Sequence, residues 1–265
     1  MSGLIPVELM KWLALSIVIL ALTAQAPARA DVVSDECEMP ADLVTPSAPL
    51  THVADALAGS GKVEILAIGS GSTVGETGGS TGPAYTYRTP EASFPFRMLD
   101  ALRQMRPSAQ FNLTVKGGRN MTADAMYSTL VQELAGHHYD LLLWQTGTVE
   151  AVRGARPQTL REVLEQGVDA AAKADADVVL IDPQFSRFLR ANTDMNPYEM
   201  VLEQIAGMPN VSLFRRFELT QTWVSSGRID LERVGRDERD KTIALLNTCL
   251  GHALARYVLA GAEAH

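Results

Sequence analysis

Residues 63–75, which read VEILAIGSGSTVG, decide the fold that this sequence predicts. The first six residues of the stretch are nearly all apolar, a pattern typical of a parallel strand that is buried on both faces. A glycine- and serine-rich turn, which we place at residues 69–82, ends the strand. Ligands of parallel α/β sheets bind beyond the carboxyl ends of the strands. The turn is therefore the first place to search for a functional site.

The rest of the chain repeats this alternation of apolar runs and amphipathic helical patterns. We expect further strands at residues 111–115, 140–145, 178–181 and 211–214. We expect helices at residues 94–105, 122–134, from Pro157 onward, 197–207 and 239–259. This order predicts an α/β fold, a three-layer, doubly wound domain with a mostly parallel five-stranded sheet. We place the domain at residues 61–262, after an extended segment at residues 31–60.

The first thirty residues have the pattern of an export signal. Lys11 precedes an apolar run at residues 12–23, and Ala28, Arg29 and Ala30 match a small-x-small cleavage site. The apolar run is shorter than the roughly 20 residues that a helix needs to cross a bilayer. We therefore expect a signal peptide at residues 1–30, cleavage after Ala30, and a periplasmic or secreted protein without a later membrane span. An uncleaved membrane anchor is the alternative.

Charge and motifs argue against several classes of protein. The net charge is −8 and lysine and arginine do not cluster, so the basic surface on which nucleic-acid affinity depends is not expected. The turn after the first strand has neither the lysine of a P-loop nor the glycine spacing of a dinucleotide site. The adjacent His137 and His138 lack the further ligands that a metal site would need. We therefore expect no metal, no cofactor and no nucleic acid.

Two cysteines, Cys37 and Cys249, lie near opposite ends of the exported part. An even number of cysteines in an exported chain favours a disulfide bond. A bridge that closes so long a loop is worth roughly 4–5 kcal/mol in the chain-entropy model. Two buried free thiols are the alternative.

Segments at the predicted strand ends resemble the sequence blocks of the SGNH (GDSL-type) hydrolase superfamily, in an exported bacterial branch. They read ILAIGSGSTVG at residues 65–75, KGGRN at 116–120, DLLLWQTGTVEAV at 140–152 and VVLIDPQF at 178–185. The tail TCLGHALARYVL at 248–259 resembles the closing helix of that family, whose cysteine can also pair with one near the mature N-terminus. The resemblance spans about residues 37–259. It implies hydrolysis of ester bonds, often of acyl groups on lipids or carbohydrates.

The positions to which the resemblance assigns catalytic roles have lost most of their reactive groups. Gly71 stands at the position of the nucleophile, and Val149 replaces the asparagine that supplies an oxyanion-hole amide. Spacing back from the cysteine of the last block places the Asp-x-x-His pair at Glu238 and Lys241. Only Gly118 is retained, and it contributes to the oxyanion hole through its backbone N–H. Loss of one oxyanion donor costs roughly 10²–10³ in rate, and loss of the nucleophile or base costs up to roughly 10⁶.

Neighbouring residues could substitute for the lost groups. Ser70 and Ser72 flank Gly71 and are weak candidates for a displaced nucleophile, with Lys241 or His252 as the base. The ordinary alternatives are turn serines that bind local backbone, a solvated lysine and a surface histidine.

The sequence supports three hypotheses of function. The first is a non-catalytic or very weak member that keeps the cleft and binds an acylated carbohydrate or an envelope partner. Tyr85, Tyr87 and Arg88 could line such a cleft. The second is an active carboxyl or acetyl esterase that uses a displaced serine. The third is an accessory subunit that docks on an active homologue. Asp182 ends the fourth strand at the same edge, where an Asp-Pro pair also simply makes a turn.

Overall fold

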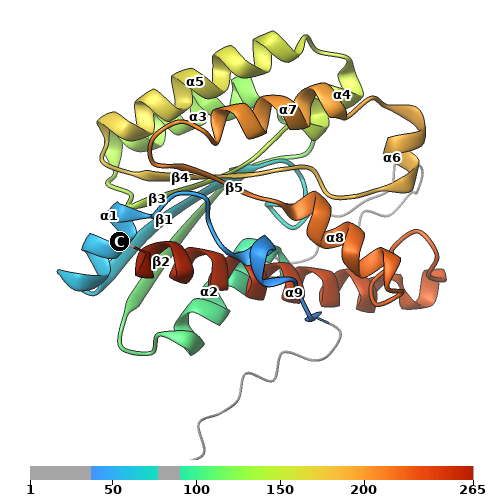
Figure 1. The fold of residues 1–265 in the computed structure, drawn as a ribbon, viewed down its shortest axis with the longest axis horizontal. Coiled ribbons are helices and arrows are strands. Elements are labelled where there is room, and N and C mark those ends of the chain that lie inside the picture. The colour runs from blue at the N-terminus through green and yellow to red at the C-terminus, as the bar shows by residue number, and fades with distance from the viewer. Residues whose placement is uncertain (1–36, 77–89, 265) are drawn as a thin grey trace, which may run out of the picture. The chain divides into compact units, whose positions relative to one another are not determined.

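Five parallel strands form the central sheet in the order β2-β1-β3-β4-β5 (Figure 1). The structure, a computed structural model, describes residues 37–76 and 90–264. The strands are β1 (Lys62–Gly69), β2 (Gln110–Gly117), β3 (Leu141–Gln145), β4 (Asp177–Ile181) and β5 (Val211–Phe214). Every neighbouring pair is parallel. The predicted α/β fold with a five-stranded parallel sheet is therefore confirmed.

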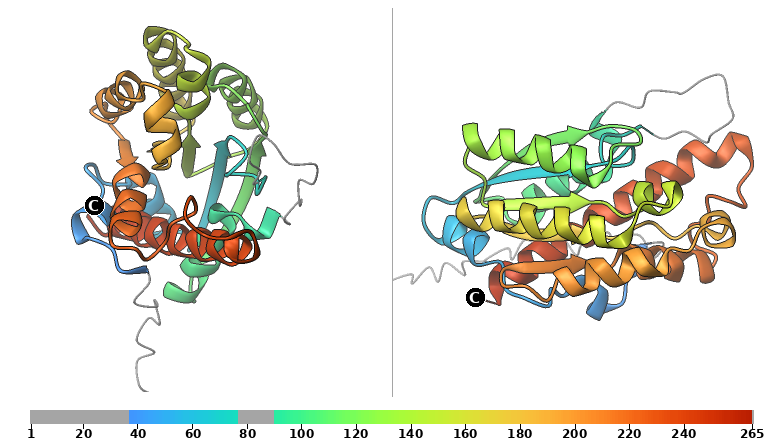
Figure 2. Two further views of the ribbon diagram at one scale, coloured as in Figure 1. Left: turned by 90° about the vertical axis from the view of Figure 1, so that its right-hand side faces the viewer. Right: turned by 90° about the horizontal axis from the view of Figure 1, so that it is seen from above.

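Two layers of helices cover the sheet, one on each face (Figure 2). One layer contains α3 (Ala123–Gly136), α5 (Pro157–Lys173) and α7 (Asn196–Ile205). The other contains α1 (Thr51–Ala58), α2 (Phe94–Met105), α8 (Arg216–Ser225) and α9 (Arg236–Glu263). The short helices α4 (Thr148–Arg153) and α6 (Arg187–Asn192) follow the carboxyl ends of β3 and β4.

Side-chain alternation along β1 explains why both faces need a helical layer. Ile65 and Ala67 belong to the hydrophobic core on the side of α2 and α9, whereas Leu66 and Ile68 belong to the core on the side of α3 and α5. All four side chains are buried. The turn after β1 is consequently held between two packed layers.

The segment that we expected to run extended through residue 60 contains helix α1, so that expectation is wrong for residues 51–58. Val53 is fully buried, and its backbone N–H donates to the Asp177 carboxylate, at 3.0 Å. Asp177 begins β4, far away in the sequence. A helix of eight residues is marginal alone, so tertiary contacts stabilise it.

Helix α9 is long and apolar enough to cross a membrane by length and composition alone. Its most apolar window is 61% buried inside the protein. Leu250, Leu254 and Val258 are completely buried in the core beside α2. The burial identifies α9 as a core helix of this domain.

A disulfide bond joins Cys37 to Cys249, which confirms the predicted bridge. Cys249 lies at the buried centre of α9. Nearby, the indole Nε1–H of Trp223 on α8 donates to the backbone oxygen of Glu38, at 2.9 Å. Both contacts tie the first described residues to the helical layer. The predicted signal at residues 1–30 lies outside the described residues.

Candidate functional site

The turn after β1 is organised around the side chain of Gln145, which ends β3. Gln145 is 2% exposed. Its Oε1 accepts from the Ser70 N–H at 3.2 Å, the Ser70 hydroxyl at 2.9 Å and the Thr73 hydroxyl at 3.1 Å. The Ser72 hydroxyl lies at 3.4 Å from the same atom. An amide oxygen is not a base, so these bonds hold the serines without activating either as a nucleophile.

Gly71 lies where the backbone leaves no room for a side chain. A Cβ atom at this residue would lie 2.9 Å from the carbonyl oxygen of Glu76, closer than real Cβ contacts. The Glu76 N–H also donates to the carbonyl oxygen of Gly71, at 2.7 Å. The turn therefore closes on itself at Gly71, the residue that the sequence resemblance aligns with the nucleophile.

Gly118, to which the resemblance assigns an oxyanion-hole role, uses its amide within the protein. Its N–H donates to the carbonyl oxygen of Gly69 at 3.3 Å. The preceding Gly117 pairs with Gly69 in the β1–β2 register and has a φ of 139°. A Cβ on Gly117 would lie 1.9 Å from the Gly69 oxygen, so only glycine allows the two strand ends to meet this closely. The amide of Gly118 is thus already paired.

Val149 lies in the first turn of α4. The hydrogen bonds in this turn are made by the next residue, Glu150. Glu150 is buried and accepts from the Gly147 N–H at 3.0 Å and from the Ala123 N–H at 2.6 Å. Ala123 begins α3. One carboxylate therefore satisfies the starts of two helices, a structural use of charge that stabilises helix N-termini.

Glu238 and Lys241 both lie within α9 and are exposed. The Asp-x-x-His of the family precedes the last helix, whereas here the helix begins at Arg236 and includes both positions. His252, further along α9, is half-buried, and its Nδ1 has no hydrogen-bond partner. In residues 37–76 and 90–264, no imidazole is hydrogen-bonded to Ser70 or Ser72.

A buried cation, Arg216, lies beside the turn. Its side chain donates to Ser72 Oγ at 3.4 Å and to Gln184 Oε1 at 2.6 Å, and it lies over the ring of Phe94. Burial lowers the pKa of Arg216 to about 10, while the charge of Asp182 acts in the opposite direction. An arginine with that pKa is still protonated at neutral pH. Arg216 therefore links the turn to the residues that follow β4.

Asp182 is a structural carboxyl at the end of β4. It is buried and accepts from the Phe217 N–H, at 2.8 Å, in the first turn of α8. Burial raises the pKa of Asp182 well above its ordinary value. The Asp182 carboxylate therefore stabilises the start of α8, in addition to its place in the turn that the Asp-Pro pair predicted.

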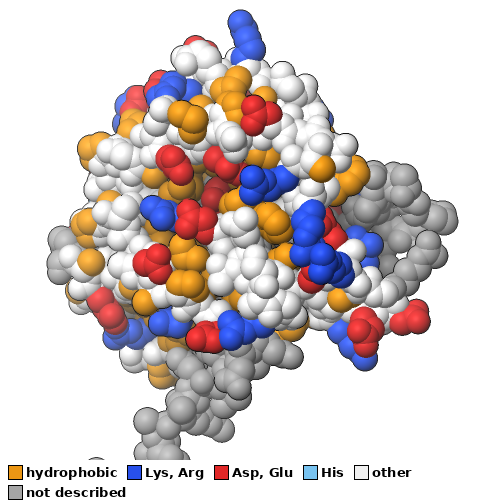
Figure 3. All heavy atoms as spheres, turned by 45° about the vertical axis from the view of Figure 1, so that its right-hand side comes forward, with side chains coloured by type: hydrophobic (Ala, Val, Ile, Leu, Met, Phe, Trp, Pro, Cys, Tyr) orange, Lys and Arg blue, Asp and Glu red, His pale blue; other side chains and the backbone are white. Residues whose placement is uncertain are grey.

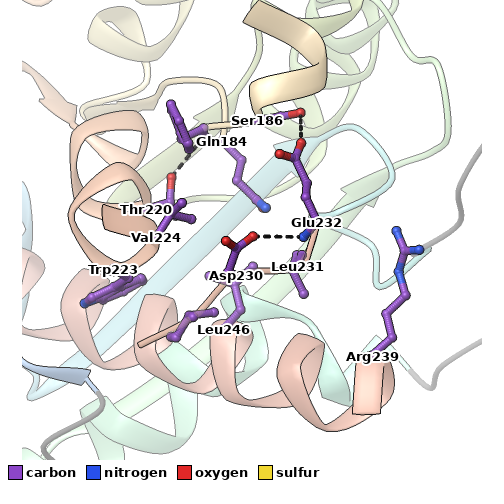
Figure 4. A pocket seen from close by; sticks show the side chains of 12 residues that line it. Gln184, Ser186, Thr220, Trp223, Val224, Asp230, Leu231, Glu232, Arg239 and Leu246 are labelled. Carbon is purple, nitrogen blue, oxygen red and sulfur yellow. Dashed lines mark hydrogen bonds between the residues drawn. The ribbon is translucent and has the colours of Figure 1, made fainter. Parts of the chain in front are cut away.

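A cavity of about 190 Å³ lies next to this arrangement, among α8, α9 and the segment after β4 (Figure 4). Gln184, which accepts from Arg216, is one of its lining residues. The wall of the cavity combines apolar side chains, such as Trp223 and Leu246, with charged side chains of the loop before α9, Asp230 and Glu232.

Positive and negative side chains are interspersed on the face shown in Figure 3, without a large field of either sign. Within the described part of the chain, no group of three or more His, Cys, Asp or Glu residues could hold a metal ion. His138 lies at the other end of the sheet, paired with Asp140 at 2.9 Å. Tyr85, Tyr87 and Arg88 lie outside the described residues.

Several residues that shape this region were not identified as site residues from the sequence. Gln145 and Arg216 make the central contacts, and Glu150 and Glu76 close the surrounding loops. Gln145 offered a signal, because a glutamine at the end of an apolar strand needs a hydrogen-bonding partner. Arg216 offered none, since one of two adjacent arginines after a strand gives no indication of which is buried.

Several solved structures share the fold. LAE5, an alpha/beta hydrolase enzyme from the metagenome of Lake Arreo, Spain, has 15% identity and a TM-score of 0.55 over 76% of this chain and 95% of its own. Axe2, an acetylxylan esterase from Geobacillus stearothermophilus, has 15% identity and a TM-score of 0.54 over 76% and 94%. TesA has 14% identity and a TM-score of 0.51 over 71% and 97%. At these identities the likeness shows the fold alone. A comparison with curated protein sequences found no match.

The fold and the blocks at its strand ends define an SGNH hydrolase-type scaffold. Residues 36–264 match the model of the Non-GDSL lipase-like family. The chain therefore belongs to the Non-GDSL lipase-like family, within the SGNH/GDSL esterase superfamily.

Proposed function

We propose that this protein is an exported, non-catalytic member of its family, which binds an acylated carbohydrate at the carboxyl edge of the sheet and does not hydrolyse it. The closed turn at Gly71 carries the proposal: the nucleophile position has no side chain, and the carbonyl oxygen of Glu76 occupies the space for one. The paired amide of Gly118 removes a second catalytic element in the same place.

The hydrogen bonds of the flanking serines also support the absence of catalysis. Ser70 and Ser72 direct their hydroxyls toward Gln145, and Arg216 donates a hydrogen bond to Ser72. A protonated guanidinium cannot accept the proton that a nucleophilic serine must lose. An active esterase built on either serine would need a base from elsewhere.

Export and an envelope partner complete the proposal. Lys11 and the apolar run after it support a cleaved signal, with cleavage after Ala30, and a periplasmic or secreted location. The Cys37–Cys249 disulfide suits such an oxidising compartment. A carbohydrate ligand there belongs to the envelope, and the partner is a protein of envelope polysaccharide metabolism, either an enzyme or an active homologue on which this chain docks.

Turnover and covalent labelling test the absence of catalysis. Purified protein is assayed with p-nitrophenyl acetate and acetylated xylan, and treated with a serine-directed phosphonate probe. We expect no turnover above background and no mass shift. Ser70→Ala and Ser72→Ala are compared with Ser128→Ala, which removes an exposed hydroxyl on α3. Turnover that disappears only in Ser70→Ala or Ser72→Ala would establish the displaced-serine esterase instead.

Calorimetry tests binding with acetylated xylan oligosaccharides and their deacetylated forms. Binding that requires the acetyl groups is expected. Equal heats for both forms, or none for either, would remove the acylated carbohydrate from the proposal. Co-purification from envelope extracts tests the protein partner.

A further inference from the structure

The cavity beside α8 and α9 has an apolar floor. Trp223, Ile229 and Leu246 are buried and line it, together with Val224 and Phe185. The turn at Gly71 is a separate place, because Arg216 and Gln184 lie between the turn and the cavity. A small, largely apolar hollow of this kind is a ready place for a ligand with an apolar part.

The charged residues of the cavity wall leave one cation without an acidic partner. Asp230 and Glu232 both pair with Arg187, with N···O distances of 3.0 Å and 3.6 Å, and Asp230 also lies 3.8 Å from Arg233. Arg239 lines the same cavity, and within the described part of the chain it makes no ion pair. Both carboxylates of the wall are therefore paired with arginine, whereas Arg239 is a lining cation that has no acidic partner among the described residues.

The two ends of the cavity differ in chemistry. In Figure 4, Trp223 and Arg239 lie on opposite sides of the view, and Asp230 and Glu232 lie between them. The oxygen of Gln184 accepts from Arg216, so the amide NH₂ group of this side chain remains to donate to a ligand. In the same view Gln184 lies on the side of Trp223, and Arg239 lies on the other side. Apolar surface at one end and a guanidinium at the other suit a molecule with an alkyl chain and an anionic head.

The volume limits the size of that molecule. An apolar cavity of about 150 Å³ accommodates benzene, a molecule of six carbons. The cavity here measures about 190 Å³, which corresponds to roughly six to eight non-hydrogen atoms by the same relation. Butyrate and hexanoate fall in this range.

We propose that this cavity binds a short-chain carboxylate, with the alkyl chain against Trp223 and Leu246 and the carboxylate group at Arg239. A carboxylate and a guanidinium form paired, charge-assisted hydrogen bonds. The proposal goes beyond the function proposed above, because it needs neither a carbohydrate nor turnover and concerns a different set of residues.

Calorimetric titration of the purified protein with acetate, butyrate, hexanoate and octanoate tests the proposal. Affinity is expected to rise about fourfold for each added methylene up to hexanoate, as apolar surface is buried, and to stop rising at octanoate. Methyl hexanoate, which lacks the charge, is expected to bind roughly tenfold more weakly. No binding of hexanoate, or equal binding of the acid and its ester, would overturn the proposal.

Two variants and a control locate the site. Arg239→Gln is expected to weaken hexanoate binding roughly tenfold, whereas Arg256→Gln, an exposed arginine on the same helix, leaves it unchanged. Leu246→Phe places a larger side chain in the cavity and so reduces its free volume. This variant is expected to abolish binding while the melting temperature is kept or raised. Binding by either variant at the affinity of the original protein would place the ligand elsewhere.

Fluorescence gives a readout that does not depend on the folding of Leu246→Phe. Trp223 lines the cavity, whereas Trp144 is buried in the other core. Hexanoate is expected to change the tryptophan emission of the original protein and to leave that of Trp223→Phe unchanged. An unchanged emission in the original protein would contradict the proposed position of the alkyl chain.

Discussion

The backbone amide of Gly118 donates a hydrogen bond to the carbonyl oxygen of Gly69, across the carboxyl ends of β1 and β2. An oxyanion hole works through donors that are aimed at the developing charge and are free to bind it. Here the donor is paired with its own backbone, and the neighbouring turn closes between Gly71 and Glu76. The positions to which the resemblance assigns catalytic roles are therefore occupied by contacts that stabilise the fold.

Restoring the hydroxyl alone should not restore activity. Gly71→Ser places a side chain against the Glu76 carbonyl, and we expect the free energy of unfolding to fall by about 1–3 kcal/mol. Hydrolysis of p-nitrophenyl acetate should stay at background, because no histidine or carboxylate of residues 37–76 and 90–264 is hydrogen-bonded to the hydroxyls of Ser70, Ser72 or Thr73. Urea unfolding and the esterase assay measure the two effects. Gly235→Ser is the control, since nothing lies within 4 Å of its Cβ position. An active Gly71→Ser protein would contradict the closed-turn interpretation.

Removing the central acceptor of the turn should cost stability. Gln145→Leu leaves the Ser70 N–H and the Thr73 hydroxyl without their acceptor, and we expect a loss of about 2–4 kcal/mol. Gln158→Leu, whose exposed side chain bonds only to Glu162, should change stability by less than about 0.5 kcal/mol. Chemical denaturation of both variants measures the difference. Similar values for the two would show that Gln145 does not organise the turn.

The disulfide should account for a large part of the stability. Replacing Cys37 and Cys249 together with serine removes a crosslink that spans a sequence separation of 212 residues. The chain-entropy model gives a loss of roughly 4–5 kcal/mol. Unfolding of the original protein with and without reductant, beside the double variant, measures this loss. A melting temperature that does not respond to reductant would argue against the bridge.

The link between α6 and the loop before α9 should be sensitive to acid. The hydrogen bond from Arg187 lowers the pKa of Asp230. A lowered folded-state pKa contributes stability above the unfolded value, about 3.9, and this stability is lost as the pH falls through the lower folded value.

Asp230→Asn should therefore be less stable than the original protein by about 1 kcal/mol at pH 7. The difference should disappear below the folded-state pKa. Denaturation at a series of pH values measures it, and Asp169→Asn on the exposed side of α5 serves as the control. A difference that persists unchanged into strong acid would exclude an ionic origin.

Long apolar patterns predicted the sheet and the larger helices, whereas four short helices were missed. At the start of each missed helix, a carboxylate accepts a hydrogen bond from a backbone N–H group. Asp177 accepts from α1, Asp182 from α8 and Glu232 from α6. These carboxylates lie 35 to 124 residues away from the helices they cap. Glu150 does the same for α4 from within that helix. No local pattern in the sequence contains the three distant partners, so only the folded chain could reveal those helices.

The residues that the resemblance aligns with the nucleophile and the oxyanion hole lie at one edge of the sheet. Their contacts, however, were decided by packing. The sequence by itself determined the class of fold and the absence of a side chain at residue 71, because these depend on residue type and periodicity along the chain. It favoured the disulfide between Cys37 and Cys249, which the structure contains. Only the tertiary structure decided that Gln145 holds the flanking serines, that the Gly118 amide is already paired, and that Arg216 is buried beside the turn. The physical reason is that a hydrogen-bond donor chooses among all acceptors that folding brings within about 3 Å, and neighbours in space are not neighbours in sequence.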